Sequence, residues 1–289
     1  MPDIPGYTLN QKMTEGGCAE IYSALEQSSG KLVVVKVLHP RHLANKAEYK
    51  RLQDEGALCL KLGRHDNIAQ VFHTGMAGNL PYVVMEFVRG RTLRELVNEK
   101  RLFNDIELLK LAKSMCRALR FVHEKGYVHK DIKPDNIMIS QEGRLKLLDF
   151  GFAEPIKQGF SLFGGGNKSL DGSPAYMAPE LFSTKKATVA TDVYALGCTL
   201  YEMATGAPPF TGMSSSQVIS LQRDMTASAN PISKINKHIS LLTERMILTM
   251  CQKDANKRFK SCEEILLDLA RNPGWRGARE SQRITAVTA

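Results

Sequence analysis

The stretch "YVHKDIKPDNIMIS", residues 127–140, decides how the whole chain is interpreted. It sets two aspartates, two lysines, a histidine and an asparagine between apolar neighbours, and the run Ile-Met-Ile at 137–139 predicts a buried strand. Charged groups close to a core are costly to desolvate unless they have partners. Partners for Asp131, Lys133 and Asn136 are therefore expected, either elsewhere in the chain or in a ligand.

The composition is typical of a soluble globular protein. The chain has 289 residues, enough for one large domain or two lobes, and 43% are hydrophobic and 24% charged. It contains no run of roughly 18 to 20 apolar residues and no signal peptide, so we expect no membrane segment and a cytoplasmic location. The six cysteines form no C-x-x-C pair, which argues against a zinc site or a disulfide framework. Most are expected to be buried thiols, with Cys18 in a glycine-containing loop as the exception.

Basic residues outnumber acidic ones by 39 to 30, which gives a formal net charge of +9. Nucleic-acid binding is one interpretation, but no aromatic-interleaved basic stripe or reader motif accompanies the charge. A solvated basic surface, or affinity for phosphate-bearing ligands, explains it better, and no nucleic-acid partner is expected.

Hydrophobic periodicity predicts a β-rich first third followed by a helical remainder. Before Gly90, one helix is expected over 47–62 and strands over 6–13, 19–25, 31–38, 68–75 and 81–87. Beyond Gly90, capping pairs begin helices at Thr92/Glu95 and Asn104/Glu107. A loop is expected over 153–170, and further helices over 191–204, 239–251 and 263–270.

The predicted fold class is α+β and bilobal, an architecture suited to a cleft. A small β-rich N-terminal lobe with one main helix covers 1–87, and a larger, mostly helical C-terminal lobe covers 88–271. A polar tail follows over 272–289.

The segment "MTEGGCAEIYSALE", residues 13–26, sets small residues between two predicted strands. A backbone with little side-chain bulk can approach phosphate oxygens and offer them its N–H groups. A glycine-containing hairpin turn is the alternative interpretation. The dinucleotide-binding fingerprint is excluded, because a strand and not a helix follows the glycines.

A lysine stands in the middle of the strand "VVVKVL", at Lys36. It could simply face solvent on an edge strand. Glu55, on the helix that follows, could instead supply a countercharge, and such a pair would hold the ammonium against the phosphates of a nucleotide.

Two oxygen-bearing side chains end short β segments, Asn136 after the opening stretch and Asp149 in "LKLLDFGFAE". A hairpin turned at Glu142-Gly143 would bring them together, and a few hard oxygen ligands beside phosphates and water suit Mg²⁺. Taken singly, Asp-Phe-Gly is only a turn signal. The four segments described above, namely the glycine-containing segment, the strand with Lys36, the stretch 127–140 and the segment with Asp149, are not expected in this order by chance.

These segments together resemble the eukaryotic-type (Hanks-type) serine/threonine protein kinases, which also occur in bacteria. The resemblance spans residues 7 to about 270. The motifs, in order, are a glycine-rich loop from Thr14 to Ile21, Lys36, Glu55, His129-Lys130-Asp131 with Lys133 and Asn136, Asp149-Phe150-Gly151, and Ala178-Pro179-Glu180. Asp192 and Gly197 also match, and Arg258 is expected to pair with Glu180.

The resemblance implies a protein-kinase-like fold, ATP and Mg²⁺ as cofactors, and protein substrates with Ser or Thr acceptors. Asp131 would orient the substrate hydroxyl and accept its proton, and Lys133 would stabilise charge on the γ-phosphoryl group. Asn136 and Asp149 would hold Mg²⁺. Lys36, with Glu55 behind it, would bind the α- and β-phosphates.

The remaining nucleotide contacts are assigned by the same resemblance. The loop would cover the phosphates, Met85 would line the adenine pocket, and the backbone of Glu86 to Val88 would meet the adenine ring. The loop residues concerned are Thr14, Glu15, Gly16, Gly17 and Ile21. "DIKPDN" and Gly172-Ser173-Pro174 favour the serine/threonine subtype, and Asp135 is interpreted as an anchor for the loop backbone.

Three residues depart from the family pattern: Thr14 and Ala19 replace loop glycines, and Lys130 stands where arginine is usual. Because of these departures, two alternative functions stay open. The first is a nucleotide-binding pseudokinase that acts as a scaffold, and the second is a small-molecule phosphotransferase. The lysine at position 130 binds phosphate less specifically than the usual arginine would, because it lacks the planar fork of donors. Activity is therefore expected to depend weakly on phosphorylation of Ser161 and Ser169. Lys130 would then pair with an acidic group or be solvated.

Overall fold

The computed structural model describes residues 1–15, 17–156, 172–184 and 186–271. Several predicted features therefore lie outside the described residues and stay predictions: Gly16, Ser161, Ser169, the part of the predicted loop over 157–170, and the tail 272–289.

The chain divides into two compact units. The first is Met1–Arg89 with the short segment Asp149–Gly151, and the second is Gly90–Leu148 with Phe152–Ala289. A small unit built on an antiparallel sheet and a larger helical unit give the α+β class that the sequence predicted. None of the helices in the described part of the chain is long and apolar enough to cross a membrane.

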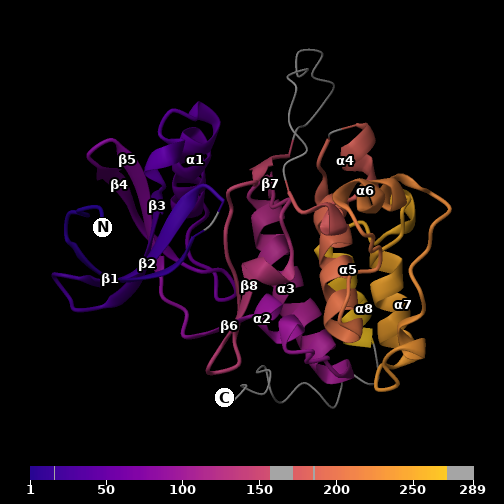
Figure 1. Cartoon of the computed structure of the whole chain (residues 1–289). Helices are drawn as coiled ribbons and strands as arrows, with labels where there is room; N and C mark the ends of the chain where they lie inside the picture. Colours follow the sequence, from indigo (N-terminus) through magenta and orange to yellow (C-terminus); the bar gives the residue numbers. More distant parts are fainter. Residues whose placement is uncertain (16, 157–171, 185, 272–289) are drawn as a thin grey trace. The chain divides into compact units, whose positions relative to one another are not determined.

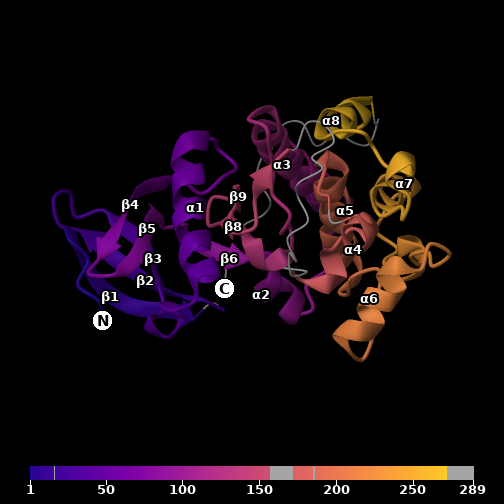
Figure 2. The same ribbon diagram turned by 90° about the horizontal axis from the view of Figure 1, so that it is seen from above.

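The smaller unit is a five-stranded antiparallel sheet in the order β1-β2-β3-β5-β4, with helix α1 packed on one face (Figures 1 and 2). Its elements are β1 (Tyr7–Glu15), β2 (Ala19–Glu26), β3 (Leu32–Leu38), α1 (Lys46–Leu62), β4 (Val71–Ala77) and β5 (Leu80–Glu86). Successive side chains of a strand point to opposite faces. Val33, Val35 and Val37 of β3 are therefore buried in an apolar core with Tyr22 and Val84, and Lys36 lies on the other face.

A glycine brings α1 close to the sheet. A Cβ built on Gly56 would lie 2.4 Å from Cγ2 of Thr74 and 2.9 Å from Cγ2 of Val83. Real Cβ contacts are not that short, so only glycine permits this approach. The neighbouring Glu55 is thereby buried against the sheet, with 5% of its surface exposed.

The larger unit is built around α5 (Val189–Thr205). Every residue from Thr191 to Ala204 is buried, as expected of a helix that is covered on all sides. Helices α3 and α7 pack against it, and α8 packs on α3 (Figure 1). The other helices are α2 (Leu93–Asn98), α3 (Asp105–Glu124), α4 (Pro179–Ser183), α6 (Ser215–Arg223), α7 (Leu241–Met250) and α8 (Cys262–Arg271).

Short strands and 3-10 turns complete this unit. The strands are β6 (Gly90–Thr92), β7 (Tyr127–Val128), β8 (Ile137–Ser140), β9 (Leu145–Leu147) and β10 (Glu154–Pro155). The 3-10 turns that matter below are η2 (Pro134–Asn136) and η3 (Pro174–Tyr176). Both predicted capping boxes form, with Glu95 N donating to Thr92 Oγ1 at 3.2 Å and Glu107 N donating to Asn104 Oδ1 at 3.0 Å.

The structure differs from the sequence prediction at several elements, and three of them are informative. Strand β4 begins at Val71 and not at 68. Helix α6 was not predicted, because its serine-rich sequence buries only Gln222 and so carries little apolar periodicity. Strand β10 lies inside the predicted loop, where two residues pair with β7 through their backbone alone.

Candidate active site

In the smaller unit, Lys36 contacts two carboxylates. Its Nζ lies 2.9 and 2.8 Å from the two carboxylate oxygens of Glu55 and 3.1 Å from Oδ2 of Asp149. Glu48, another acidic residue of α1, instead lies 3.2 Å from the Arg51 guanidinium. Burial by itself would lower the pKa of Lys36, but the charges of Asp149 and Glu55 outweigh it and raise the pKa. The ammonium is therefore positively charged at neutral pH.

Asp149 is held in a strained backbone conformation. Its φ of +42° lies in the left-handed region, which residues other than glycine rarely adopt. The amide of Gly151 donates to its Oδ1 at 3.0 Å, which fixes one carboxylate oxygen while the other faces Lys36. With 38% of its side chain exposed, this carboxylate remains accessible to a ligand.

The other predicted nucleotide contacts of this unit lie on the hairpin and at the end of β5. Thr14 pairs with Ile21 across the hairpin, and a Cβ added at Gly17 would meet nothing within 4 Å. The amide of Glu86 donates to the carbonyl of Gln70 at 2.8 Å. Glu86 therefore cannot offer its N–H to a ligand, whereas among the described residues the backbone of Val88 has no backbone partner.

In the larger unit, the opening stretch forms a tight polar cluster. The Lys133 ammonium lies 2.7 Å from Oδ2 of Asp131, and Nδ2 of Asn136 lies 2.8 Å from that oxygen and 2.8 Å from the Asp131 carbonyl. Lys133 also donates to Oγ of Ser173 at 3.2 Å. Asp131 is 6% exposed and Asn136 8%, so each desolvated group has a partner. The partners that the sequence required are in part supplied by the cluster itself.

The loop that carries this cluster is anchored on α5 by Asp192, which is fully buried. Its two oxygens accept from the amides of His129 and Lys130, each at 2.8 Å, and Nε2 of His123 lies 2.8 Å from Oδ2. Burial opposes ionisation of Asp192, but the hydrogen bond and charge of His123, together with the charge and backbone hydrogen bond of His129, outweigh burial and lower the pKa of this carboxyl group. The ionised carboxylate holds Lys130 at φ +70°, a left-handed conformation that turns the chain towards Asp131.

Lys130 was predicted either to pair with an acidic group or to be solvated, and the structure shows the first of these. Its Nζ lies 3.2 Å from Oε2 of Glu154 in β10, and both side chains are largely buried. Asp135 differs from its interpretation as a backbone anchor, because its Oδ2 accepts from Nε of Arg94 on α2 at 3.2 Å.

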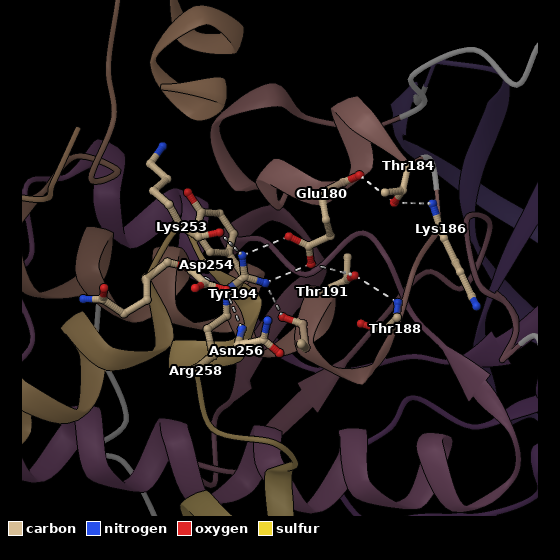
Figure 3. Close-up of polar contacts among 12 residues, drawn as sticks. Glu180, Thr184, Lys186, Thr188, Thr191, Tyr194, Lys253, Asp254, Asn256 and Arg258 are labelled. Carbon is tan, nitrogen blue, oxygen red and sulfur yellow. Dashed lines mark hydrogen bonds and ion pairs between the residues drawn. The ribbon is translucent and has the colours of Figure 1, made fainter. Parts of the chain in front are cut away.

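Away from these groups, the buried Arg258 forms an ion pair with the partly exposed Glu180, as Figure 3 shows. Nη1 and Nη2 of Arg258 donate to the two oxygens of Glu180 at 2.8 and 2.9 Å. The three remaining N–H groups donate to backbone carbonyls, those of Ala190, Lys253 and Gln252. All five donors of the guanidinium are thus used, and its plane lies over the ring of Tyr194 with 4.7 Å to the centroid.

Replacing Arg258 with alanine should lower the free energy of unfolding by about 3 to 5 kcal/mol, because a carboxylate and three carbonyls lose their partner. Lysine should rescue little of this loss, since it cannot reproduce five donors in a planar fork. Urea unfolding followed by circular dichroism measures both variants.

The matched control is Arg120→Ala. Arg120 pairs with Glu263, but both side chains are more than 40% exposed, and the change should stay within about 1 kcal/mol. Equal losses in the Arg258 and Arg120 variants would contradict the assignment of a special role to the Arg258–Glu180 pair.

Comparison with known proteins agrees with this geometry. The model of the family described as "Protein kinase domain" matches residues 7–268. The chain belongs to the protein kinase family. It is 32% identical over 271 residues to the probable serine/threonine-protein kinase PknB of Corynebacterium glutamicum, covering 92% of this chain and 42% of that protein.

Two further bacterial relatives give the same result. Identity to the serine/threonine-protein kinase PknB of Mycobacterium leprae is 33% over 269 residues, and identity to PknB of Mycobacterium tuberculosis is 32% over 274 residues. Each alignment covers 92% of this chain and 42% of the relative. The kinase domain thus spans about two fifths of the length of the relatives that it matches. The predicted resemblance to Hanks-type kinases is confirmed.

Some polar contacts of this kinase domain were not foreseen from the sequence. Glu154 was placed in a loop, and Arg94 contacts Glu202, which lies 108 positions further along the chain. No motif spacing connects residues so far apart. The only available signal was an acidic residue, Glu202, within a largely apolar predicted helix.

Proposed function

We propose that this kinase domain is catalytically active and transfers the γ-phosphoryl group of ATP, in the presence of Mg²⁺, to Ser or Thr hydroxyls of proteins. The observation that carries the proposal is the Asp131–Lys133–Asn136 cluster, in which an ammonium and an amide both contact one carboxylate. A pseudokinase would need none of these groups. The names of the bacterial relatives support the same acceptor class.

Within the cluster, Asp131 would accept the proton of the substrate hydroxyl. Its carboxylate is oriented by Asn136 and by Lys133, so it is positioned before a substrate arrives. Lys133 would then balance negative charge on the transferred group. Because its ammonium also reaches Ser173, it connects the catalytic loop to the segment that precedes Ala178-Pro179-Glu180.

The residues present fit a magnesium ion. The amide nitrogen of Asn136 is directed at Asp131, and its Oδ1 accepts no hydrogen bond from the described part of the chain. In the smaller unit, the partly exposed carboxylate of Asp149 offers a second hard oxygen. Mg²⁺ would neutralise charge on the phosphates of ATP. We propose Asn136 and Asp149 as its protein ligands.

The smaller unit would bind the nucleotide. Lys36 carries the positive charge for the α- and β-phosphates, and Glu55 keeps its ammonium in place. The hairpin would cover the phosphates with Thr14, Glu15, Gly16, Gly17 and Ile21. Met85, the carbonyl of Glu86 and the backbone of Val88 would meet the adenine. The domain would act in the cytoplasm, where ATP is available.

Incubation of the purified chain with γ-labelled ATP, Mg²⁺ and a generic protein substrate tests the proposal. We expect label on serine or threonine, and no transfer after chelation of the metal. Nucleotide binding without transfer would indicate the pseudokinase scaffold instead. Label on a small molecule but on no protein would indicate a small-molecule phosphotransferase.

Basal activity should depend only weakly on phosphorylation of the segment before Ala178-Pro179-Glu180. Glu154 already compensates the charge of Lys130. A phosphate on that segment would therefore have to compete with Glu154 for the Lys130 ammonium. Phosphatase-treated enzyme and a Ser161→Ala/Ser169→Ala variant should each keep more than about a hundredth of the untreated activity, a barrier change below about 2.7 kcal/mol.

The comparison variant is Glu154→Gln, which removes the negative charge that pairs with the Lys130 ammonium and leaves Lys130 itself unchanged. Phosphorylation should influence its activity more than that of the wild type. A hundredfold or larger loss in both the phosphatase-treated enzyme and the double-serine variant would contradict the prediction.

A further inference from the structure

An arginine on α2 lies at the centre of a polar cluster that the proposed mechanism does not use. The Arg94 guanidinium donates through Nη1 to Oε1 of Glu202 at 2.8 Å and through Nη2 to the Tyr176 hydroxyl at 2.6 Å. Its Nε donates to Oδ2 of Asp135 at 3.2 Å. One side chain thus joins α2, the 3-10 turns η2 and η3, and the central helix α5.

This cluster adjoins the site where the acceptor hydroxyl would bind. Asp135 follows Lys133 by two residues, and Tyr176 follows Ser173 by three. Lys133 and Ser173 are themselves in contact, at 3.2 Å. A protein segment that presents its hydroxyl to Asp131 would therefore pass close to Arg94 and its partners.

Two acidic groups, Asp135 and Glu202, would form an anionic subsite if Arg94 were absent. Glu202 is almost completely buried, at 2% exposed, and it also accepts from the Tyr176 hydroxyl, whereas 46% of the Asp135 side chain is exposed. Burial opposes the charge of Arg94, but Glu202, Tyr176 and Asp135 together outweigh burial and raise the pKa of the guanidinium. Arg94 is therefore a permanent cation that fills the space between the two carboxylates.

We propose that Arg94 is a specificity-determining residue: it occupies the acidic subsite of Asp135 and Glu202, so that a basic substrate side chain gains little there. The inference rests on the proposed protein kinase function. Arginine is suited to this role because its planar fork satisfies three partners in different directions, which a lysine ammonium could not do with the same geometry. The enzyme would accept hydroxyls flanked by neutral residues as readily as hydroxyls flanked by arginine.

The experiment compares peptides that carry one serine, with arginine placed in turn at the three positions on either side, against an all-alanine parent. The readout is the ratio of kcat/KM for the best arginine peptide to that for the parent. We expect a ratio below about threefold for the wild type and at least about tenfold higher for Arg94→Ala, because one charge-assisted hydrogen bond supports about a tenfold preference. Arg94→Gln, whose amide can still donate to Glu202, should give the same increase if the alanine variant does not fold.

Two further variants separate specificity from structure. Adding Glu202→Gln to Arg94→Gln should return the ratio towards that of the wild type. Arg91→Ala removes a neighbouring arginine whose partner is the exposed Glu99, and it should leave the ratio unchanged. A purely structural role of Arg94 would lower kcat/KM for all peptides alike and leave their ratio constant, which would overturn the proposal.

A wild-type ratio above tenfold would overturn it as well. If the wild type transfers no phosphate, the proposed function fails by itself. In that case, fluorescence polarisation measures the peptide dissociation constants of wild type and Arg94→Gln. The ratio of affinities for the arginine peptide and the parent then replaces the ratio of kcat/KM. An unchanged ratio in that measurement would also overturn the inference.

Discussion

Replacing Asp131 with asparagine should reduce turnover by about 10² to 10⁴ while the affinity for nucleotide stays unchanged. Asparagine has nearly the same shape and keeps an oxygen that can accept from Asn136, which is 2.8 Å from the carboxylate in the wild type. It lacks the negative charge and cannot accept the proton of a substrate hydroxyl. The loss should therefore appear in kcat, and calorimetric titration with ATP and Mg²⁺ should give the wild-type affinity.

The control for this variant is Asp54→Asn, the same chemical change at a carboxylate that is 64% exposed and pairs with Lys50 at the surface. Its turnover should equal that of the wild type. Near wild-type turnover in Asp131→Asn, with an unchanged melting temperature, would refute the role assigned to Asp131.

Lys36→Met should reduce turnover by at least about 10², the size expected when one preorganised charge is removed from a reacting group. Methionine fills the space of the aliphatic stem but leaves the buried Glu55 and the nearby Asp149 without the ammonium that lies between them. Some ATP binding can survive through other contacts, so the fall should be larger in kcat than in affinity. Lys50→Met, at an exposed lysine on α1, is the matched control.

The role of Glu55 is tested beside it. Glu55→Gln should lose only about tenfold, since its amide oxygen still accepts from the Lys36 ammonium although the charge is gone. Glu48→Ala should be nearly silent, because Glu48 contacts Arg51 and not Lys36. Full activity in both Glu55→Gln and Glu55→Ala, together with an inactive Glu48→Ala, would transfer the role to Glu48.

Local sequence determined much of this domain. Alternation along β3 placed the valines in the core and Lys36 on the opposite face, since side chains of a strand point in turn to its two faces. Thr92 and Asn104 marked the starts of α2 and α3, because capping depends only on residues three positions apart. The cluster of Asp131, Lys133 and Asn136, which we propose to be catalytic, is similarly short in range. Its motif could therefore be interpreted without a structure.

Tertiary structure decided which charges meet wherever no motif connected them. The packing of α1 against the sheet at Gly56 fixes the face of the helix that reaches Lys36, and this is why Glu55 and not Glu48 contacts the ammonium, as the family resemblance implied. Lys130 found Glu154 because β10 pairs with β7 beside the loop, and Arg94 found Glu202 because α2 packs next to α5. The energy of an ion pair falls with distance and depends on burial. The partner of a charged residue is therefore set by how helices and strands pack, and not by the order of residues along the chain.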